Sequence, residues 1–396
     1  MKTSSVTFRH SILKSILILS LFDIAQCASK SEEYQDVKFR MTKDLFIGTY
    51  TRDEGHVDGK ADGIYKLVLD NEGKIIEKIT AVELMNPSYL TLDTARNILY
   101  SVSETGPDDG AEGSLLAFQL LVSGKLETID SVGSGAYYPC HVAINKAGNL
   151  VLVSNYVGGV VSVFKSDNGK LSLLQKLSFT GSGSHLRQNA SHTHMAKLSP
   201  SEDFLFVTDL GSNVIWNFKW DADEQLFLQN ELQIRLKMEE GFGPRHLVFH
   251  PKGHLAAVIN ELDNSVSLLS YSPETGVLEV LDSKSILSRE GEEIAKTAAD
   301  IHFHPNGRFL YGSQRGENII SVFAIISESK LQLIQQISSE GEIPRNFAIS
   351  KDGKVMWVAN QNSNNIAIFQ IDIVTGLLTY SKQYKDILTP VCIVGR

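Results

Sequence analysis

The sequence predicts an all-β fold: a seven-bladed β-propeller with four-stranded antiparallel blades, its ring closed by the C-terminal strand. Two observations lead to this prediction. Seven short segments of one shape recur along the chain at spacings of 46 to 54 residues. Each of the first six is followed by a turn rich in Gly, Pro, Asn and Asp, and then by further short apolar runs. A repeat of this length with four strands is typical of a propeller blade.

The recurring segment has a small or proline-containing entry followed by a short apolar strand, as in residues 243–249 (GPRHLVF). One position of the aligned segments is occupied by Tyr89, His141, His194, His246, Asp300, Asn346 and Cys392. A second strand is expected at residues 98–102, 150–154, 204–208, 255–259, 309–313 and 355–359. A third and a fourth strand follow in each repeat. The runs are too short and too rich in β-branched residues for helices.

The two ends of the chain each supply part of one blade. The seventh segment, residues 389–393, has no strands after it, whereas residues 45–47, 64–69 and 74–79 form strands without an entry segment. We therefore expect the C-terminal strand to pair beside residues 45–47, which removes an exposed half-blade edge. The propeller domain is expected over residues 45–396, after a polar lead-in at residues 28–44.

The first 27 residues have the features of a secretory signal peptide. Basic residues precede an apolar stretch at residues 16–22, and Ala25 and Cys27 are small residues at the positions that signal peptidase reads. We expect residues 1–27 to be removed and the protein to be exported, to the periplasm or the medium. An uncleaved anchor is one alternative. Lipid attachment through Cys27 is another, and the bulky Gln26 disfavours it. No later segment is apolar for long enough to span a membrane.

Composition excludes several partners. The 396-residue chain carries a net charge of −9 and has no basic stripe, so nucleic acid is not an expected partner. Removal of Cys27 leaves Cys140 and Cys392, too few for a disulfide framework, and both fall in predicted strands as buried thiols. The sequence has no phosphate-binding glycine loop, zinc-type spacing or nucleophile elbow. We expect no cofactor, no metal and a monomer.

The predicted site is one mouth of the central channel. In an antiparallel hairpin the start of the first strand lies beside the end of the second, so an innermost first strand brings both points to the same mouth. The strand starts supply Ser88, Tyr89, Cys140, His141, His194, Arg245, His246, Asp300 and Arg345. The strand ends supply Glu104, Asn155, Tyr156, Asp209, Asn260, Glu261, Gln314, Arg315 and Asn360. Any one of these residues is more often structural than functional, but together they indicate a site.

Four further histidines are expected away from this mouth. They lie at or near the hairpin turns on the far side and are His250, His254, His302 and His304.

From about residue 45 onward the chain resembles the lactonase family of seven-bladed propellers. That family includes 6-phosphogluconolactonases and the fungal carboxymuconate-lactonising enzyme. The resemblance rests on residues 48–51 (GTYT), 191–194 (SHTH), 244–251 (PRHLVFHP), 260–261 (NE) and 314–316 (QRG). It implies a metal-free site for an anionic lactone, with His194, Arg245, Glu261 and Arg315 as its catalytic residues. The export signal departs from the cytoplasmic origin of phosphogluconolactone, which leaves the substrate open.

These residue types suit lactone hydrolysis. Water attacks the carbonyl with the help of a base such as His194, and the ring oxygen leaves. One of Arg245 and Arg315 would bind a phosphate or carboxylate, and the other would stabilise the oxyanion. Glu261 would either protonate the leaving oxygen or orient an arginine. The residues expected to bind substrate are His141, His246, Asn155, Asp209 and Arg345.

Two other classes of function remain open at this point. A non-catalytic propeller would bind a protein or glycan at the same mouth and show no turnover. A metal-dependent sugar lactonase would hold a divalent cation with Glu104, Asn155, Asp209 and Glu261, and would be sensitive to chelators.

Overall fold

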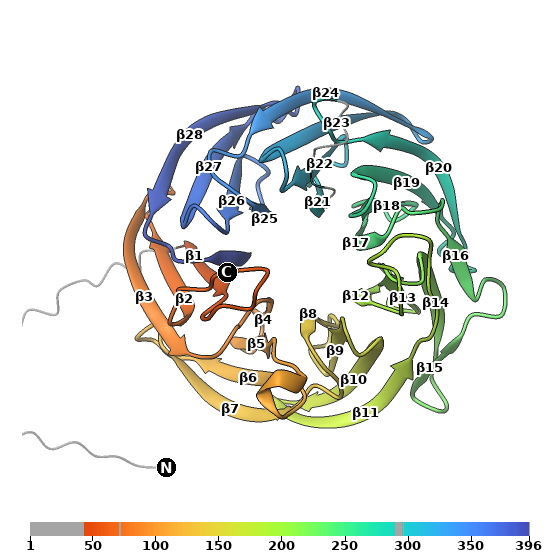
Figure 1. The fold of residues 1–396 in the computed structure, drawn as a ribbon, viewed down its shortest axis with the longest axis horizontal. Helices are drawn as coiled ribbons and strands as arrows, with labels where there is room; N and C mark the ends of the chain where they lie inside the picture. The colour runs from red at the N-terminus through yellow and green to blue at the C-terminus, as the bar shows by residue number, and fades with distance from the viewer. Residues whose placement is uncertain (1–42, 71–72, 290–294, 296, 396) are drawn as a thin grey trace, which may run out of the picture. The chain divides into compact units, whose positions relative to one another are not determined.

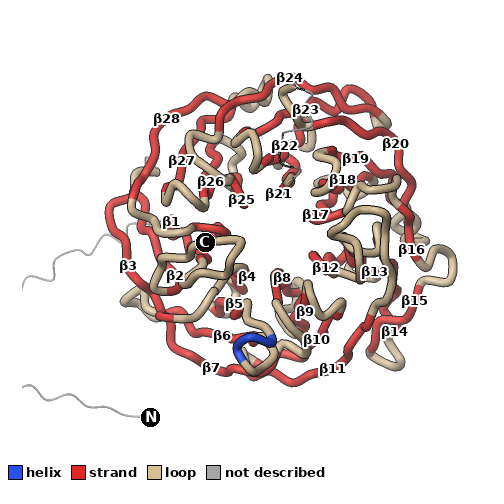
Figure 2. Tube along the Cα trace, viewed as in Figure 1, coloured by secondary structure: helices blue, strands red, loops and turns tan. Residues whose placement is uncertain are grey.

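The computed structural model describes residues 43–70, 73–289, 295 and 297–395. These residues form seven antiparallel sheets around a central channel (Figure 1), so the prediction of a seven-bladed β-propeller is confirmed. Figure 2 shows strands and loops almost throughout, and the one helical turn in the described residues is η1 (Pro107–Asp109). The expected signal peptide lies outside the described residues. Within them, no helix has the length and apolar character needed to cross a membrane.

Each blade runs from an innermost to an outermost strand. The innermost strands are β29 (Pro390–Gly395), β4 (Leu90–Asp93), β8 (Pro139–Ile144), β12 (Thr193–Leu198), β17 (Pro244–Phe249), β21 (Ala298–Phe303) and β25 (Pro344–Ile349). The second strands are β1 (Lys43–Thr49), β5 (Ile98–Ser103), β9 (Leu150–Asn155), β13 (Phe204–Asp209), β18 (Leu255–Asn260), β22 (Phe309–Gln314) and β26 (Val355–Asn360).

The outer half of each blade is completed by two more strands. The third strands are β2 (Gly63–Leu69), β6 (Ser114–Leu120), β10 (Val160–Asp167), β14 (Val214–Asp221), β19 (Ser265–Tyr271), β23 (Ile319–Ser327) and β27 (Asn365–Ile371). The fourth strands are β3 (Ile75–Glu83), β7 (Leu126–Gly133), β11 (Lys170–Ser178), β15 (Leu226–Gln229), β20 (Leu278–Ser285), β24 (Lys330–Ser338) and β28 (Leu378–Lys385). One blade has an additional short strand, β16 (Arg235–Lys237), which also pairs with β14.

The C-terminal strand closes the ring as expected. β29 pairs antiparallel with β1, so that Ile393 lies opposite Ile47 and Gly395 opposite Leu45. The resulting sheet has the order β29-β1-β2-β3, and it joins the two ends of the described chain in one blade. β1 begins at Lys43, two residues before the expected start of the domain.

Apolar side chains between neighbouring blades form the core. In one such cluster, Leu152 and Val163 of one sheet pack with Leu205 and Trp216 of the next, and all four are buried. Burial of a side chain of this size stabilises the fold by about 1.5–3 kcal/mol. Because every blade has such contacts on both sides, the ring holds the channel-lining strands in fixed positions.

Two of the histidines expected on the far side join neighbouring blades at hairpin turns. His250 Nε2 lies 2.8 Å from the carbonyl oxygen of Gly307, and His304 Nε2 lies 2.8 Å from that of Gly353. Both glycines have positive φ, of 75° and 73°, which glycine adopts without strain. A Cβ on Gly307 would lie 2.4 Å from His250 Nε2, so the contact also requires the missing side chain. His250 and His304 therefore have a structural role, away from the channel mouth.

Candidate active site

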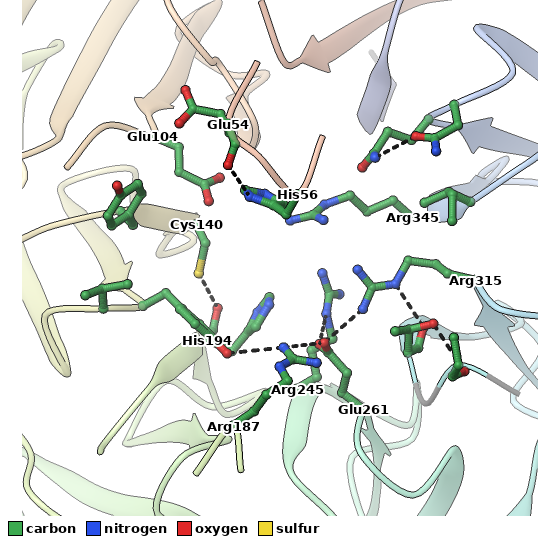
Figure 3. A pocket seen from close by; sticks show the side chains of 18 of the residues that line it. Glu54, His56, Glu104, Cys140, Arg187, His194, Arg245, Glu261, Arg315 and Arg345 are labelled. Atoms are coloured by element: carbon green, nitrogen blue, oxygen red, sulfur yellow. Dashed lines mark hydrogen bonds and ion pairs between the residues drawn. The ribbon is translucent and has the colours of Figure 1, made fainter. Parts of the chain in front are cut away.

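A cavity of about 980 Å³ occupies one mouth of the central channel. Figure 3 shows side chains that line it, contributed by most blades of the ring. The four residues expected to be catalytic are brought together here: His194, Arg245, Glu261 and Arg315 all line the cavity. Of the five expected to bind substrate, only Arg345 lines it.

β-Bulges direct the inner-strand side chains into this cavity. The strand pairing shifts by one residue between Pro139 and His141, Thr193 and Met195, Pro244 and His246, and Pro344 and Asn346. The extra residues are Cys140, His194, Arg245 and Arg345, and each of them lines the cavity. A bulge re-aims the side chain of the extra residue and bends the strand. The same local irregularity in these four blades thus supplies four groups of the site, and a shift of the same kind also occurs in the β21–β22 and β29–β1 pairs.

The second strands end one residue later than the sequence predicted. The residues expected at the strand ends therefore fall into two groups, one inside the strand and one directly after it. The final strand residues Asn155, Asp209, Asn260, Gln314 and Asn360 do not line the cavity. Of the residues that directly follow a second strand, Glu104, Tyr156, Glu261, Arg315 and Gln361 do line it. Successive side chains of an extended chain point to opposite sides, so a shift of one residue separates structural from cavity-lining groups.

Asp209 and Asn155 are bound to their own surroundings. Asp209 accepts hydrogen bonds from Ser191 Oγ at 2.7 Å, the Trp216 indole at 3.1 Å and two backbone N–H groups. Asn155 accepts from Ser134 Oγ at 2.7 Å and donates to Val160 O at 3.2 Å. Both side chains are fully buried. Both residues were expected to bind substrate, but these contacts already use their polar atoms and neither residue lines the cavity.

Glu261 is the centre of an arginine cluster. Its Oε1 lies 2.7 Å from Arg187 Nη2 and 3.0 Å from Arg315 Nη2, and its Oε2 lies 2.9 Å from Arg245 Nε. Burial raises the pKa of the Glu261 carboxyl, but the charges of the three arginines outweigh burial and hold that pKa well below its usual range. The carboxyl is therefore ionised at neutral pH. This geometry favours the arginine-orienting role over that of a proton donor.

The cluster contains more positive than negative charge. Three guanidiniums share one carboxylate, and Arg345 lines the same cavity. Burial, reinforced by the charges of Arg245, Arg345 and Arg187, lowers the pKa of Arg315 to about 9 although Glu261 acts in the opposite direction. The excess of positive charge is local to the group around Glu261, since the rest of the cavity lining includes several carboxylates.

His194 is a buried, neutral imidazole on the cavity wall. Burial, followed by the charges of Arg245 and of neighbouring residues, holds the pKa of His194 well below its ordinary value. Its Nδ1 is buried and has no hydrogen-bond partner among the described residues. Its ring packs edge-on against Tyr156 at 5.7 Å and His246 at 5.1 Å. An unprotonated imidazole facing a polar cavity can accept a proton.

His246 and His141, both expected to bind substrate, belong to a cluster of packed rings on the inner strands. The His141 ring packs against Tyr89 at 4.5 Å and His246 at 6.0 Å, and neither histidine lines the main cavity. His246 Nδ1 lies 2.9 Å from Asp300 Oδ1. His302, expected on the far side as a bystander, lies on β21 with its Nε2 3.0 Å from Asp300 Oδ2. His302 therefore belongs to the polar network of the channel.

The opposite wall of the cavity is acidic. Figure 3 shows Glu54, Glu104 and His56 across the cavity from Glu261 and Arg245. Tyr50 donates a hydrogen bond to Glu104 Oε2 at 2.9 Å and accepts one from Arg345 Nη2 at 3.1 Å. Arg345 is thereby tied to the acidic wall.

Sequence reasoning missed Arg187 and the loop that carries Glu54 and His56. Arg187 lies in the connection between β11 and β12, where the repeat gives no position to align, and its side chain is 43% exposed at the cavity. Tyr50 stood in the GTYT stretch and could have been noticed from it.

The residues suggested for a metal site do not form a ligand set. Glu261 faces three guanidiniums, and Asp209 and Asn155 are engaged elsewhere. Burial also raises the pKa of the Cys140 thiol, which excludes a thiolate nucleophile at neutral pH. Cys140 and Cys392 are both free and buried.

Comparison with known proteins gives a consistent result. Residues 44–395 match the family model described as lactonase, 7-bladed beta-propeller. The 6-phosphogluconolactonase of Bacillus subtilis is 32% identical over 359 residues, which cover 89% of this chain and 98% of that protein. The 6-phosphogluconolactonase of Formosa agariphila is 36% identical, with 84% and 94% covered. The crystal structure of a periplasmic gluconolactonase from Pseudomonas aeruginosa superimposes with a TM-score of 0.81 at 27% identity, and the match covers 89% of this chain and 99% of that one.

Proposed function

Because the chain belongs to the lactonase family of seven-bladed β-propellers, we propose that it hydrolyses an anionic, sugar-derived lactone of the 6-phosphogluconolactone type. The family and the named relatives make the chain a lactone-hydrolysing enzyme. The identity of the lactone and the metal-free chemistry are the parts that we propose. A purely binding propeller is disfavoured by these relatives.

The arginine cluster is the observation that supports an anionic substrate. Three guanidiniums around one buried carboxylate leave a local surplus of positive charge on this wall of the cavity. A buried charge without a partner is costly, and a phosphate or carboxylate would supply the missing negative charge through two parallel hydrogen bonds. The whole protein has a net charge of −9, so attraction of an anion must come from this local group.

The acidic wall supports a substrate that carries hydroxyl groups. Glu104 and Glu54 face the cavity across from the arginines. Ionised carboxylates accept hydrogen bonds only, so they suit the hydroxyls of a sugar and repel a second anionic group. A lactone with an anionic group at one end and hydroxyls at the other fits both walls.

We assign the base role to His194. The neutral imidazole removes a proton from water as the oxygen attacks the lactone carbonyl, and the carbonyl oxygen gains the negative charge. Arg245 stabilises this oxyanion. The bond from the carbonyl carbon to the ring oxygen then breaks, and His194 returns its proton to that oxygen. The ionised Glu261 supplies no proton and keeps the guanidiniums in place. A bound anion offsets the charge of Arg245, so it is expected to raise the pKa of His194 toward neutrality.

The surroundings of Glu261 support metal-free chemistry. A divalent cation would have to approach a carboxylate already shared by three guanidiniums, which repel it. Activity is therefore expected to survive treatment with EDTA. Loss of activity in EDTA and its return on addition of a divalent cation would contradict the proposal.

Hydrolysis of 6-phosphogluconolactone by the purified protein tests the proposal directly. Arg245→Lys and Arg315→Lys keep the charge but lose the planar fork, and each is expected to cost about 1.5–3 kcal/mol in transition-state binding. Arg96→Lys is the matched control, because Arg96 pairs with Asp93 at 2.8 Å in a hairpin turn away from the cavity. Unchanged kcat/KM in both site variants, or equal turnover of neutral lactones, would exclude recognition of an anion by these arginines.

We also propose that the protein is exported after removal of residues 1–27. The signal-like sequence and the periplasmic location named for the Pseudomonas aeruginosa relative support this. The mass of the mature protein decides the question. A soluble protein that retains Met1 would argue against a signal peptide.

A further inference from the structure

The protein holds the guanidinium of Arg245 on two of its three nitrogens. Nη1 donates to the carbonyl oxygen of Ala299 at 2.5 Å and lies 3.2 Å from His246 Nε2. Nε lies 2.9 Å from Glu261 Oε2, an ion pair without an aligned hydrogen bond. Among the described residues no acceptor contacts Nη2. A ligand in the cavity would therefore meet the Nη2 edge.

The contact between Arg245 and His246 requires one tautomer of the imidazole. A guanidinium nitrogen can only donate, so Nε2 must carry the lone pair and Nδ1 the proton. Nδ1 lies 2.9 Å from Asp300 Oδ1, and an ionised carboxylate can only accept. The two neighbours of His246 thus select the same tautomer.

Asp300 is built to remain a carboxylate. Its oxygens accept from His246 Nδ1 at 2.9 Å, His302 Nε2 at 3.0 Å, Asn346 Nδ2 at 2.6 Å, and the backbone N–H groups of Ile301 and Phe347. Burial raises the pKa of Asp300, but His302, His246 and these donors outweigh it and hold that pKa well below its usual range. Asp300 therefore accepts from Nδ1 at any pH near neutrality.

We propose that Asp300, acting through His246, is a positioning residue that fixes the rotation of the Arg245 guanidinium and presents Nη2 to the substrate. This rests on the proposed function only in assigning the bound oxygen to a lactone. Asp300 lies on β21, His246 on β17 and Asn346 on β25, so three neighbouring inner strands set the position of one catalytic nitrogen.

The arrangement has a defined pH limit. Protonation of His246 would place an N–H on Nε2, opposite the N–H groups of Arg245 Nη1, and two donors cannot bond. Burial, followed by the charge of Arg245, lowers the pKa of His246 to about 4, so the arrangement is intact at neutral pH. The other groups that face this imidazole are Asp300, with His302 behind it, the rings of Tyr89, His141 and His194, and Lys197, whose charge acts on His141.

Two variants and one spectroscopic measurement test the proposal. His246→Phe keeps an aromatic ring but removes the acceptor for Nη1. Asp300→Asn offers an amide that cannot satisfy both His246 and its other donors. His254→Gln is the control, because His254 lies in a far turn with its side chain 39% exposed. Nitrogen-15 NMR of histidine-labelled wild-type protein reports which imidazole nitrogen of His246 carries the proton.

We expect the wild-type His246 to be protonated at Nδ1, and Asp300→Asn to shift the proton toward Nε2. In His246→Phe, kcat/KM for 6-phosphogluconolactone should fall at least thirtyfold. At pH 7 this variant should bind inorganic phosphate at least tenfold more weakly than wild type. The phosphate affinity of the wild type should fall as the pH drops toward 4, where His246 becomes protonated, and the variant should not show this fall. His254→Gln should behave as wild type.

Each measurement can also overturn the proposal. A wild-type His246 protonated at Nε2 excludes it outright, whether or not either variant folds. A folded His246→Phe protein with phosphate affinity within threefold of wild type excludes it as well. Tautomer and phosphate binding need no turnover, so a protein that passes both tests but does not hydrolyse the lactone would refute the proposed substrate and leave the positioning role standing.

Discussion

Replacement of Glu261 by Gln separates its two possible roles. The side chain is 4% exposed, and the variant keeps its size while removing the one negative charge shared by Arg187, Arg245 and Arg315. Removal of one partner of a buried ion pair destabilises a protein by about 3–5 kcal/mol. Arg187 is 43% exposed and can turn toward water, so we expect a loss of about 3 kcal/mol, near the lower limit of that range.

Anion rescue makes this prediction specific. Inorganic phosphate at ten times its dissociation constant stabilises a folded protein by about 1.4 kcal/mol. The variant has three guanidiniums without a carboxylate, so we expect phosphate to bind it more tightly than wild type and to recover more of the free energy of unfolding. Urea unfolding with and without phosphate measures both effects. Glu127→Gln, an exposed glutamate on β7, is the matched control.

Kinetics complete the test. If Glu261 orients the arginines, Glu261→Gln lowers kcat/KM but leaves the shape of its pH profile unchanged, because an ionised residue titrates outside the working range. Disappearance of the alkaline limb in the variant would show that Glu261 is a proton donor. A variant as stable as wild type, with no added response to phosphate, would refute the charge argument itself.

Two further predictions concern stability. Acidification from pH 6.5 to 4 should lower the free energy of unfolding by about 3 kcal/mol through His246 alone, because its pKa is about 4 in the folded protein and about 6.5 in the unfolded chain, which binds more protons in that range. His141 and His194, whose pKa values are also lowered by folding, act in the same direction. Midpoints of urea unfolding that do not fall over this pH range would contradict the prediction. Truncation after Leu388 removes β29 and leaves β1 as an open edge, so the whole ring should melt at lower temperature by calorimetry, and an unchanged transition would contradict closure by this strand.

The fold was predictable because the repeat is written into the sequence. Each blade has the same entry, turn and second strand, and seven copies with one incomplete end allow few other arrangements. The inner-strand side of the site followed from the same alignment. The aligned position of the repeat falls at or next to the bulge in these blades. Cys140, His194, Arg245 and Arg345 were therefore all expected at the mouth, and all four line the cavity.

The remaining site residues were harder to predict for two physical reasons. Strand ends carry an uncertainty of about one residue, and a single step turns a side chain to the opposite side. Asp209 and Glu261 were therefore grouped together, although one is enclosed in its own blade and the other faces the cavity. Arg187 comes from a loop, and a repeat says nothing about where a loop crosses the mouth. Pairing of His246 with Asp300 depends on neighbouring blades and is visible only in three dimensions.

The surplus of positive charge connects the stability of this protein to its chemistry. Without a ligand, Arg315 is buried among like charges, and only Glu261 offsets them. An anion that enters the cavity relieves this repulsion, so binding and stabilisation have the same physical source. The anion also reduces the charge that keeps His194 a weak base, so the substrate would strengthen the base that attacks it. A lactone without an anionic group would lack both effects. The arginine cluster would therefore select a substrate by raising its rate of hydrolysis as well as its affinity.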